Sequence, residues 1–172
     1  MIDVFQESAE AVGAVVKRFV SAADAVSYVR GLAGDAPVSA SYLPQEIRQE
    51  FTGTPFAAPA EFANTRLCIS FARAGIAATG SLLLELADPH ERSATALPLI
   101  HAVFVKGSTI VPDLYALHEL IARELASAKT AYLSITTGPS RTADIERVLT
   151  IGVHGPKELH VLVLEGLVLE GE

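Results

Sequence analysis

The sequence predicts an α/β fold, a Rossmann-like layered domain with a mostly parallel sheet. Short segments rich in Val, Ile and Leu alternate with amphipathic stretches of about 10–15 residues, which is the pattern of βαβ units. The late apolar segments show no polar alternation, and this is typical of strands covered on both faces. Because the 172 residues contain no repeat and no linker, we expect one domain over residues 1–172, with a loose tail at about residues 165–172.

Composition and charge exclude several classes of function. Half of the residues are apolar and only 19% are charged, which excludes a disordered chain. The net charge of −7 argues against a general nucleic-acid binder and against adhesion to anionic membranes. The longest apolar runs, of about 4–6 residues, are too short to span a bilayer. The first residues lack the basic and apolar regions of a secretory signal. We therefore expect a cytoplasmic protein.

Cys68 is the single cysteine of the chain. One thiol cannot form an internal disulfide, and by itself it cannot hold zinc or an iron–sulfur cluster. The histidines are not at metal-ligand spacing, and P-loop, GxGxxG and GxSxG motifs do not occur. We therefore expect no metal site and no intrinsic cofactor.

The first part of the chain predicts two strands and two helices. Residues 14–19 form a β-branched strand, and Ser21 and Asp24 then have the spacing of a capping box at a helix start. A second strand follows at residues 38–42, and Pro44 opens a short helix that ends near residue 51.

The middle of the chain predicts mainly strands. The apolar stretch 67–86 is interrupted by Gly75 and Gly80, which predicts two or three short strands joined by tight turns. Residues 88–95 are polar and are expected to form a loop. Residues 99–106 are expected to form another strand.

The last third predicts two helices and two strands. Asp113 is the expected N-cap of the clearest helix, in which Leu114, Leu117, Ile121 and Leu125 share one face. The remaining elements are a strand at residues 131–137, a turn at 138–141, a short helix at 142–149 and a final strand at 159–164.

The turn after the strand at residues 131–137 has the strongest signal for a ligand. Gly138 and Pro139 lead into Ser140, Arg141 and Thr142, which supply two hydroxyls and a guanidinium. If a helix begins here, its first N–H groups carry partial positive charge. This combination favours a carboxylate or phosphate.

A capped helix without a ligand is an equally good interpretation of this segment. Arg141 and Asp144 are three residues apart and can pair on a helix surface. Asp144 and Glu146 already complement the helix dipole, and their charges would repel an anion.

Further candidate residues lie in two other loops and at His101. His154 stands between two glycines and a proline, where it is suited to acid–base work at neutral pH. The alternative is a loop histidine bonded to backbone. Gly80 lets the backbone approach a ligand, and the hydroxyls of Thr79 and Ser81 flank it. This stretch also fits an ordinary turn. His101 enters an apolar strand, which favours a hydrogen-bonded core histidine.

Several of these segments together resemble the lactate-utilization protein C family, also called LUD domain proteins. The similar stretches read GPSRTADIE at 138–146, GVHGP at 152–156, GIAATGS at 75–81 and LPLIH at 97–101. They occur in the family's order, and the likeness extends from about residue 11 to residue 164. There are two departures: many relatives have an acidic residue where this chain has Ala78, and relatives tend to carry a longer N-terminal region.

The resemblance implies a NagB/RpiA/CoA-transferase-like fold and a role in the bacterial oxidation of L-lactate to pyruvate, beside partner proteins that carry iron–sulfur clusters. In this hypothesis the chain is a non-redox subunit that binds a small carboxylate or phosphate-bearing ligand, with Arg141 holding the anion and His154 as the catalytic acid or base. The predicted ligand-binding residues are Thr79, Gly80, Ser81, His101, Gly138, Pro139, Ser140, Arg141, Thr142, Asp144 and Gly155.

Two alternatives remain open. One is a stand-alone isomerase, CoA transferase or ligase that acts on an anionic acyl or sugar-phosphate substrate. The other is a scaffold for the iron–sulfur proteins. A homo-oligomer is a further expectation, since the apolar content is high.

Overall fold

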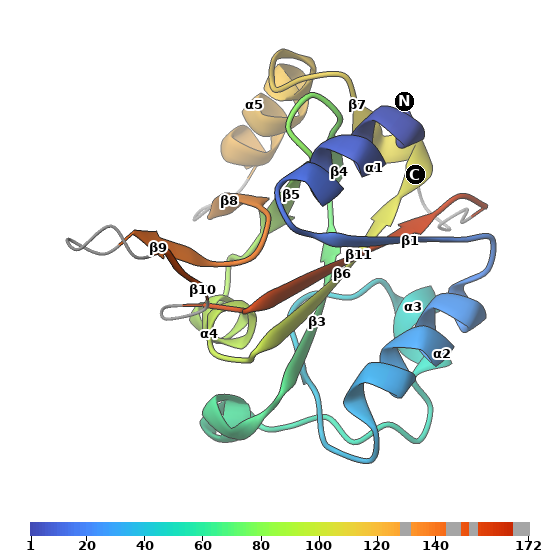
Figure 1. Ribbon diagram of the computed structural model, residues 1–172, viewed down its shortest axis with the longest axis vertical. Helices are drawn as coiled ribbons and strands as arrows, with labels where there is room; N and C mark the ends of the chain where they lie inside the picture. Colours follow the sequence, from blue (N-terminus) through green and yellow to red (C-terminus); the bar gives the residue numbers. More distant parts are fainter. Residues whose placement is uncertain (128–131, 144–148, 152–154, 167–172) are drawn as a thin grey trace.

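The computed structural model describes residues 1–127, 132–143, 149–151 and 155–166, and its described strands form two sheets and a hairpin (Figure 1). The first sheet is parallel and has five strands, in the order β1 (Val15–Phe19), β11 (Glu158–Leu164), β6 (Ile100–Lys106), β3 (Leu67–Ala72) and β2 (Ser39–Ala40). The predicted α/β class with a mostly parallel sheet is thereby confirmed.

A second, four-stranded sheet was not foreseen as a separate layer. Its order is β7 (Ile110–Val111), β4 (Ala74–Ile76), β5 (Ser81–Glu85) and β8 (Leu133–Thr137). β5 is antiparallel to both of its neighbours, because only a tight turn joins it to β4. The predicted strands at 67–86 are therefore divided between the two sheets.

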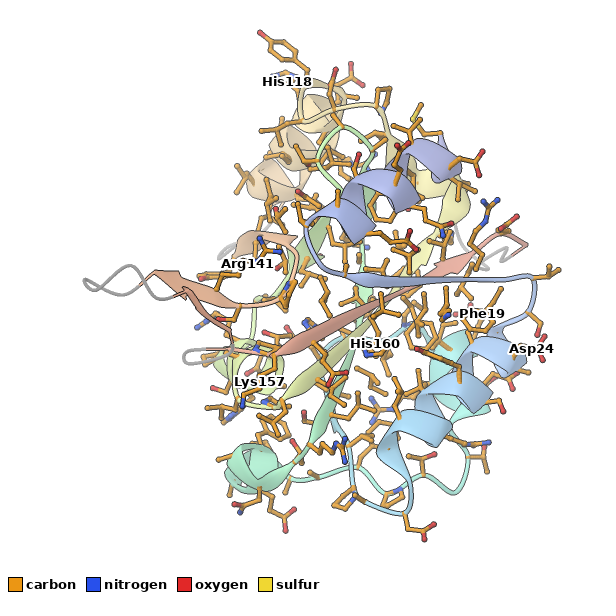
Figure 2. The ribbon with its side chains drawn as sticks, viewed as in Figure 1. Phe19, Asp24, His118, Arg141, Lys157 and His160 are labelled. Atoms are coloured by element: carbon orange, nitrogen blue, oxygen red, sulfur yellow. The ribbon has the colours of Figure 1, made fainter. Side chains whose placement is uncertain are left out.

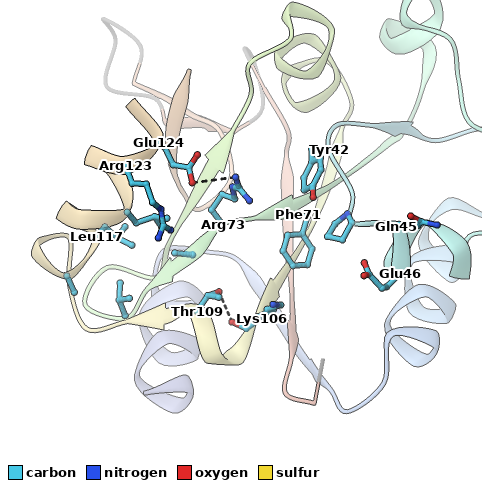
Figure 3. A pocket seen from close by; sticks show the side chains of 15 residues that line it. Tyr42, Gln45, Glu46, Phe71, Arg73, Lys106, Thr109, Leu117, Arg123 and Glu124 are labelled. Atoms are coloured by element: carbon cyan, nitrogen blue, oxygen red, sulfur yellow. Dashed lines mark hydrogen bonds and ion pairs between the residues drawn. The ribbon is translucent and has the colours of Figure 1, made fainter. Parts of the chain in front are cut away.

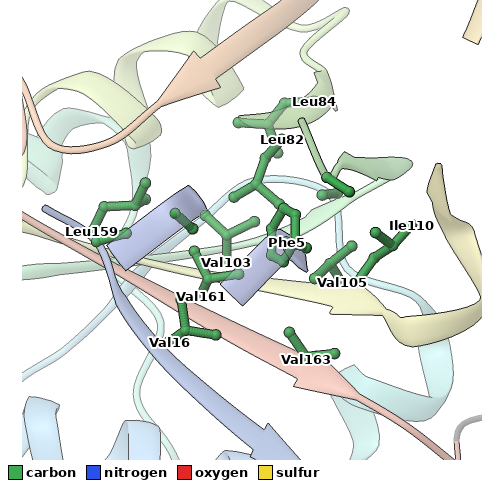
Figure 4. Close-up of a cluster of buried hydrophobic side chains, with 14 of the residues drawn as sticks. Phe5, Val16, Leu82, Leu84, Val103, Val105, Ile110, Leu159, Val161 and Val163 are labelled. Carbon is green, nitrogen blue, oxygen red and sulfur yellow. The ribbon is translucent and has the colours of Figure 1, made fainter. Parts of the chain in front are cut away.

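The parallel sheet is covered on both faces, as its apolar strands require. Helices α2 (Ala22–Ala33) and α3 (Gln45–Glu50) cover one face. Helix α1 (Ile2–Ala11) and the second sheet cover the other (Figure 4).

Successive residues of β6 point alternately into the two hydrophobic clusters, one on each face of the parallel sheet. Val103 and Val105 pack in the cluster that contains Phe5 of α1, whereas Phe104 faces α3 and meets Phe51 edge-to-face at 6.1 Å between ring centroids. Full burial of such a side chain contributes about 1.5–3 kcal/mol.

A third cluster lies on the outer face of the second sheet. Leu117 packs there, in the short 3-10 turn η3 (Tyr115–Leu117) that leads into α5 (His118–Ser127). The Ala116 N–H donates to the Asp113 carboxylate at 3.0 Å, but the helix expected to begin at Asp113 begins only at His118, and Leu114 is 53% exposed rather than on its buried face. Two other short 3-10 turns are η1 (Pro59–Asn64) and η2 (Gly107–Thr109). No helix among the described residues is long and apolar enough to cross a membrane.

The N-cap half of the predicted capping box of α2 is confirmed: the Asp24 N–H donates to Ser21 Oγ at 3.1 Å, and the Asp24 carboxylate accepts from the Ser21 hydroxyl at 2.7 Å. The predicted loop at 88–95 is wrong, because helix α4 runs over Pro89–Ala96. Asp88 accepts from the His90 N–H at 2.7 Å, and the Asp88 N–H donates to Glu91 at 3.3 Å. These caps replace the apolar periodicity that α4 lacks.

The predicted helix at 142–149 is also wrong for its described residues. β9 (Arg141–Ala143) pairs antiparallel with β10 (Leu149–Ile151), with Thr142 opposite Thr150. β-Branched residues such as Thr142, Thr150 and Ile151 favour extended backbone, and pairing across the hairpin overrides the helical caps seen in the sequence. No helix N-terminus therefore begins at residue 142.

Helix α1 was not predicted, although Ile2, Phe5 and Ala9 have the spacing of one helix face. Its C-terminal end rests directly on the turn between β4 and β5. Gly80 in that turn has φ of +63°, and a Cβ atom there would lie 2.2 Å from the backbone nitrogen of Ala9. Glycine is therefore required at position 80 for packing as well as for conformation.

We predict that Gly80→Ala lowers the free energy of unfolding by roughly 2–4 kcal/mol, because the new methyl group overlaps the α1 backbone and the left-handed conformation is strained. Gly31→Ala is the matched control. Gly31 lies inside α2 with no atom within 4 Å of the new Cβ, so this variant should be about 0.5–1 kcal/mol more stable. Urea unfolding measures both, and equal effects at the two positions would contradict the packing role of Gly80.

Candidate functional site

A cavity of about 500 Å³ opens between the second sheet and the amino ends of β6 and β11. β6 contributes His101, and β5 and β8 form a wall. The remaining sides are the turn after β8, the turn before β11 and the end of α4. Its lining consists of Leu84, Leu86, Thr95, Ala96, His101, Ser134, Ile135, Thr136, Thr137, Gly138, Pro139, Ser140, Arg141, Gly155, Pro156 and Leu159.

The two turns that border the cavity are tied together by backbone bonds. The Ser140 N–H donates to the Pro156 carbonyl at 2.9 Å, which joins the two turns, and the Lys157 N–H donates to the Leu99 carbonyl at 2.7 Å, which holds the second turn at the start of β6. A Cβ atom at Gly155 would lie 3.0 Å from the Ser140 Cβ. The small residue at 155 thus permits the close approach that places the Ser140 side chain at the cavity.

Arg141 lies beside the C-terminal end of α1 (Figure 2). Its Nη2 donates to the carbonyl of Val12, the residue that ends this helix. A cation at this end complements the helix dipole and satisfies a terminal carbonyl. Gly138, with φ of +64°, also approaches Val12, whose carbonyl oxygen would be 2.6 Å from an added Cβ. Arg141 therefore has a structural bond, and the residue is also part of the cavity lining.

His101 is buried and hydrogen-bonded, as the alternative interpretation expected. It is 2% exposed, and its Nε2 lies 2.7 Å from Ser70 Oγ on the neighbouring strand. Burial lowers the pKa of His101 from 6.5 to about 4. At neutral pH this ring is uncharged, so it can serve the cavity as a hydrogen-bonding group and not as a cation.

The turn at residues 79–81 does not line the cavity. Its hydroxyls form a chain instead: Thr79 Oγ1 lies 2.7 Å from Ser81 Oγ, which lies 2.7 Å from Thr137 Oγ1. Thr137 is a lining residue, so the turn reaches the cavity through this contact. Gly80 is explained by the packing of α1.

The structure thus brings together six of the predicted residues. They are His101, Gly138, Pro139, Ser140, Arg141 and Gly155. Thr142 lies in β9, and Asp144 and His154 lie outside the described residues.

Sequence reasoning missed several lining residues of β8 and α4. Ser134 and Thr136 alternate along β8 and face the cavity, a period-two pattern that the sequence displays. Thr95 and Ala96 were missed because α4 was predicted to be a loop.

The charge of the cavity lining comes from one side chain among the described residues. Arg141 is the only charged residue among the described residues that line it, and hydroxyls supply most of the other polar groups. Such a lining can hold a small anion by a charge-assisted bond while hydroxyls orient the rest of the molecule.

Cys68 and His160 are not among the residues that line the cavity. Burial raises the pKa of Cys68 to about 12, so its thiol is not a nucleophile at neutral pH. His160 Nδ1 lies 2.8 Å from the Tyr28 hydroxyl, and its Nε2 lies 3.1 Å from Glu158. Within the ranges that the structure describes, no group of His, Cys, Asp or Glu side chains is arranged to hold a metal ion.

The fold and the cavity define a two-sheet α/β protein with a polar pocket between its layers. The model of the LUD domain family matches residues 57–164, and the chain belongs to this family.

The match with curated relatives covers a smaller share of those proteins than of this chain. The chain is 36% identical to lactate utilization protein C of Bacillus subtilis, over 55% of this chain and 41% of that protein. It is 33% identical to the protein of the same name from Bacillus licheniformis, over 56% and 41% of the two chains. It is 31% identical to the Escherichia coli protein YkgG, over 56% and 43%. The matched segment therefore spans about two fifths of these relatives.

The fold is shared with a solved structure. The crystal structure of a DUF162 family protein from Deinococcus radiodurans superposes with a TM-score of 0.65 and covers 95% of each chain. The sequence identity is 19%, so this likeness supports the fold alone.

The buried His101 predicts a pH dependence of stability. Between pH 6.5 and about pH 4 the unfolded chain binds a proton that the folded protein excludes. The contribution of His101 is thus complete above about pH 6.5 and is lost toward pH 4, at up to about 1.4 kcal/mol per pH unit.

We expect the stability advantage of the wild type over His101→Gln to shrink by about 2 kcal/mol between pH 7 and pH 5. Urea unfolding of both proteins at the two pH values measures this difference. A constant difference would contradict a neutral, buried His101.

Proposed function

We propose that this chain acts in lactate utilization as a non-redox component that binds a small carboxylate in the cavity between its two sheets. The observation that carries the proposal is the lining of that cavity, in which Arg141 is the single charge among the described residues and the other polar groups are mostly hydroxyls. The names of the curated relatives supply the metabolic context.

The arrangement suits a hydroxy acid or keto acid. The Arg141 guanidinium provides the positive charge for a carboxylate, and Ser140, Thr136 and Thr137 offer donors and acceptors to a neighbouring hydroxyl or carbonyl. His101, neutral at physiological pH, adds a hydrogen-bonding nitrogen without competing for the anion. His154 is the proposed acid or base for the hydroxyl proton.

The oxidation itself requires a separate electron acceptor. Conversion of L-lactate to pyruvate releases two electrons and two protons, and the single Cys68 of this chain cannot hold a cluster. We assign the electrons to the iron–sulfur clusters of partner proteins. The part of this chain would be to hold the carboxylate and to move the proton.

Binding of L-lactate and pyruvate to the purified chain tests the proposal. We expect saturable binding in isothermal titration calorimetry, weakened about tenfold in Arg141→Met, because a charge-assisted bond contributes about 1.5–3 kcal/mol. Ser140→Ala should weaken binding about threefold through the loss of one neutral hydrogen bond. Arg123→Met is the matched control, since Arg123 lies in α5, away from this cavity.

Two results would overturn the assignment. One is the absence of saturable binding of either acid. The other is equal weakening by Arg141→Met and Arg123→Met. Because Arg141 also bonds to Val12, urea unfolding must accompany the titrations, and the Ser140→Ala result decides the matter if Arg141→Met is unstable.

The metabolic role is tested separately by growth. Deletion of the gene in the organism that encodes this chain should abolish growth on L-lactate while growth on pyruvate continues. Restoration by the wild type but not by His154→Ala would support the assigned proton transfer. Normal growth of the deletion strain on L-lactate would contradict the role.

A further inference from the structure

A second cavity lies at the opposite end of the parallel sheet (Figure 3). It measures about 610 Å³ and opens where β2, β3 and β6 end. Lys106 is the last residue of β6, whereas His101 of the first cavity stands near the start of the same strand. In open α/β sheets, ligands bind beyond the carboxyl ends of parallel strands. The second cavity occupies this position, and the first does not.

Three cationic side chains from different parts of the fold meet at this cavity. Arg73 follows β3, Lys106 ends β6 and Arg123 belongs to α5. These segments are far apart in sequence, so their convergence is a product of the fold. Two carboxylates, Glu46 and Glu124, also line the cavity, so the described lining has one more cation than carboxylates, and this excess favours an anionic ligand.

Arg73 is held in place by two carboxylates. Its Nε and Nη2 lie 3.0 Å and 2.9 Å from Glu85 Oε2, and its Nη2 lies 3.5 Å from Glu124. These partners orient the guanidinium and cancel much of its charge. Arg123, which is exposed at the cavity, is then the cation best placed to meet an anion, with the buried Lys106 beside it at the end of β6.

The walls of the cavity suit a flat apolar group. Tyr42 and Phe71 provide aromatic surface on one side, and Figure 3 shows both across from the α5 side chains. Val111, Leu117 and Leu120 line the α5 side. Aromatic and aliphatic surface next to cations is the chemistry that binds a flat organic anion.

We propose that this cavity binds an organic anion, in which a carboxylate or phosphate group is attached to a flat apolar body. The anionic group would lie at Lys106 and Arg123, and the body would lie against Tyr42 and Phe71. This site differs from the lactate cavity in position and in ligand class, and it does not depend on the lactate proposal.

Phenyl phosphate and benzoate are suitable probes for calorimetric titration of the whole chain. We expect saturable binding of at least one of them, and the comparison identifies whether phosphate or carboxylate is preferred. Arg123→Met and Lys106→Met should each weaken that binding about tenfold. Because Lys106 is only 4% exposed, Lys106→Met can impair folding. Arg123 is exposed, so Arg123→Met keeps the test valid.

Two control variants separate this site from the first. Arg141→Met removes the cation of the other cavity, and Arg66→Met removes an exposed arginine at the amino end of β3. Both should leave phenyl phosphate and benzoate binding unchanged. Glu46→Gln removes a carboxylate from the lining and should strengthen binding about twofold.

The proposal is overturned if neither probe binds, or if Arg123→Met leaves the affinity of the bound probe unchanged. Loss of probe binding in Arg141→Met would place the probe in the first cavity and would likewise overturn it. Since L-lactate and the flat probes report on different arginines, failure of one site is distinguishable from failure of the other.

Discussion

The arrangement of the first cavity depends on the way helix α1 ends. Its last turn meets Gly80 of the β4–β5 turn, and its terminal residue Val12 meets Gly138 and accepts a hydrogen bond from Arg141. These contacts join the N-terminus to segments more than sixty residues away. They hold the turn after β8 against the end of α1. The two glycines permit backbone contact at distances that any Cβ atom would prevent.

The parallel sheet separates two chemically different regions. At the amino end of β6, His101 is neutral and faces a lining whose only charge among the described residues is Arg141. At the carboxyl end, Lys106 joins two arginines beside aromatic side chains. A strand that is buried along its length holds these ends apart, so that each cavity has its own electrostatic character. The ligands proposed for the two cavities accordingly differ in class.

Local rules predicted the elements whose signals lie within a few residues. Ser21 caps α2 and Asp113 caps the segment before α5, because a side-chain oxygen needs only the next turn of backbone. Local rules failed for β9 and β10, where pairing across a hairpin competes with helical caps. They also failed for α4, in which caps are present but apolar periodicity is not. For β9 and β10 the deciding contacts are made across the hairpin, whereas the caps that begin α4 join Asp88 to His90 and Glu91 and were already present in the sequence.

The sequence by itself determined the α/β class, the strands of the parallel sheet and the chemical character of residues 138–141, because these follow from composition and short-range spacing. It also carried the motifs that place the chain in the LUD domain family. Only the tertiary structure decided which of these residues share a cavity. It placed Arg141 against the end of α1, and it placed Thr79–Ser81 outside the cavity lining. It alone revealed the cations around Lys106. Convergence of distant segments depends on strand order and packing, which no local pattern records.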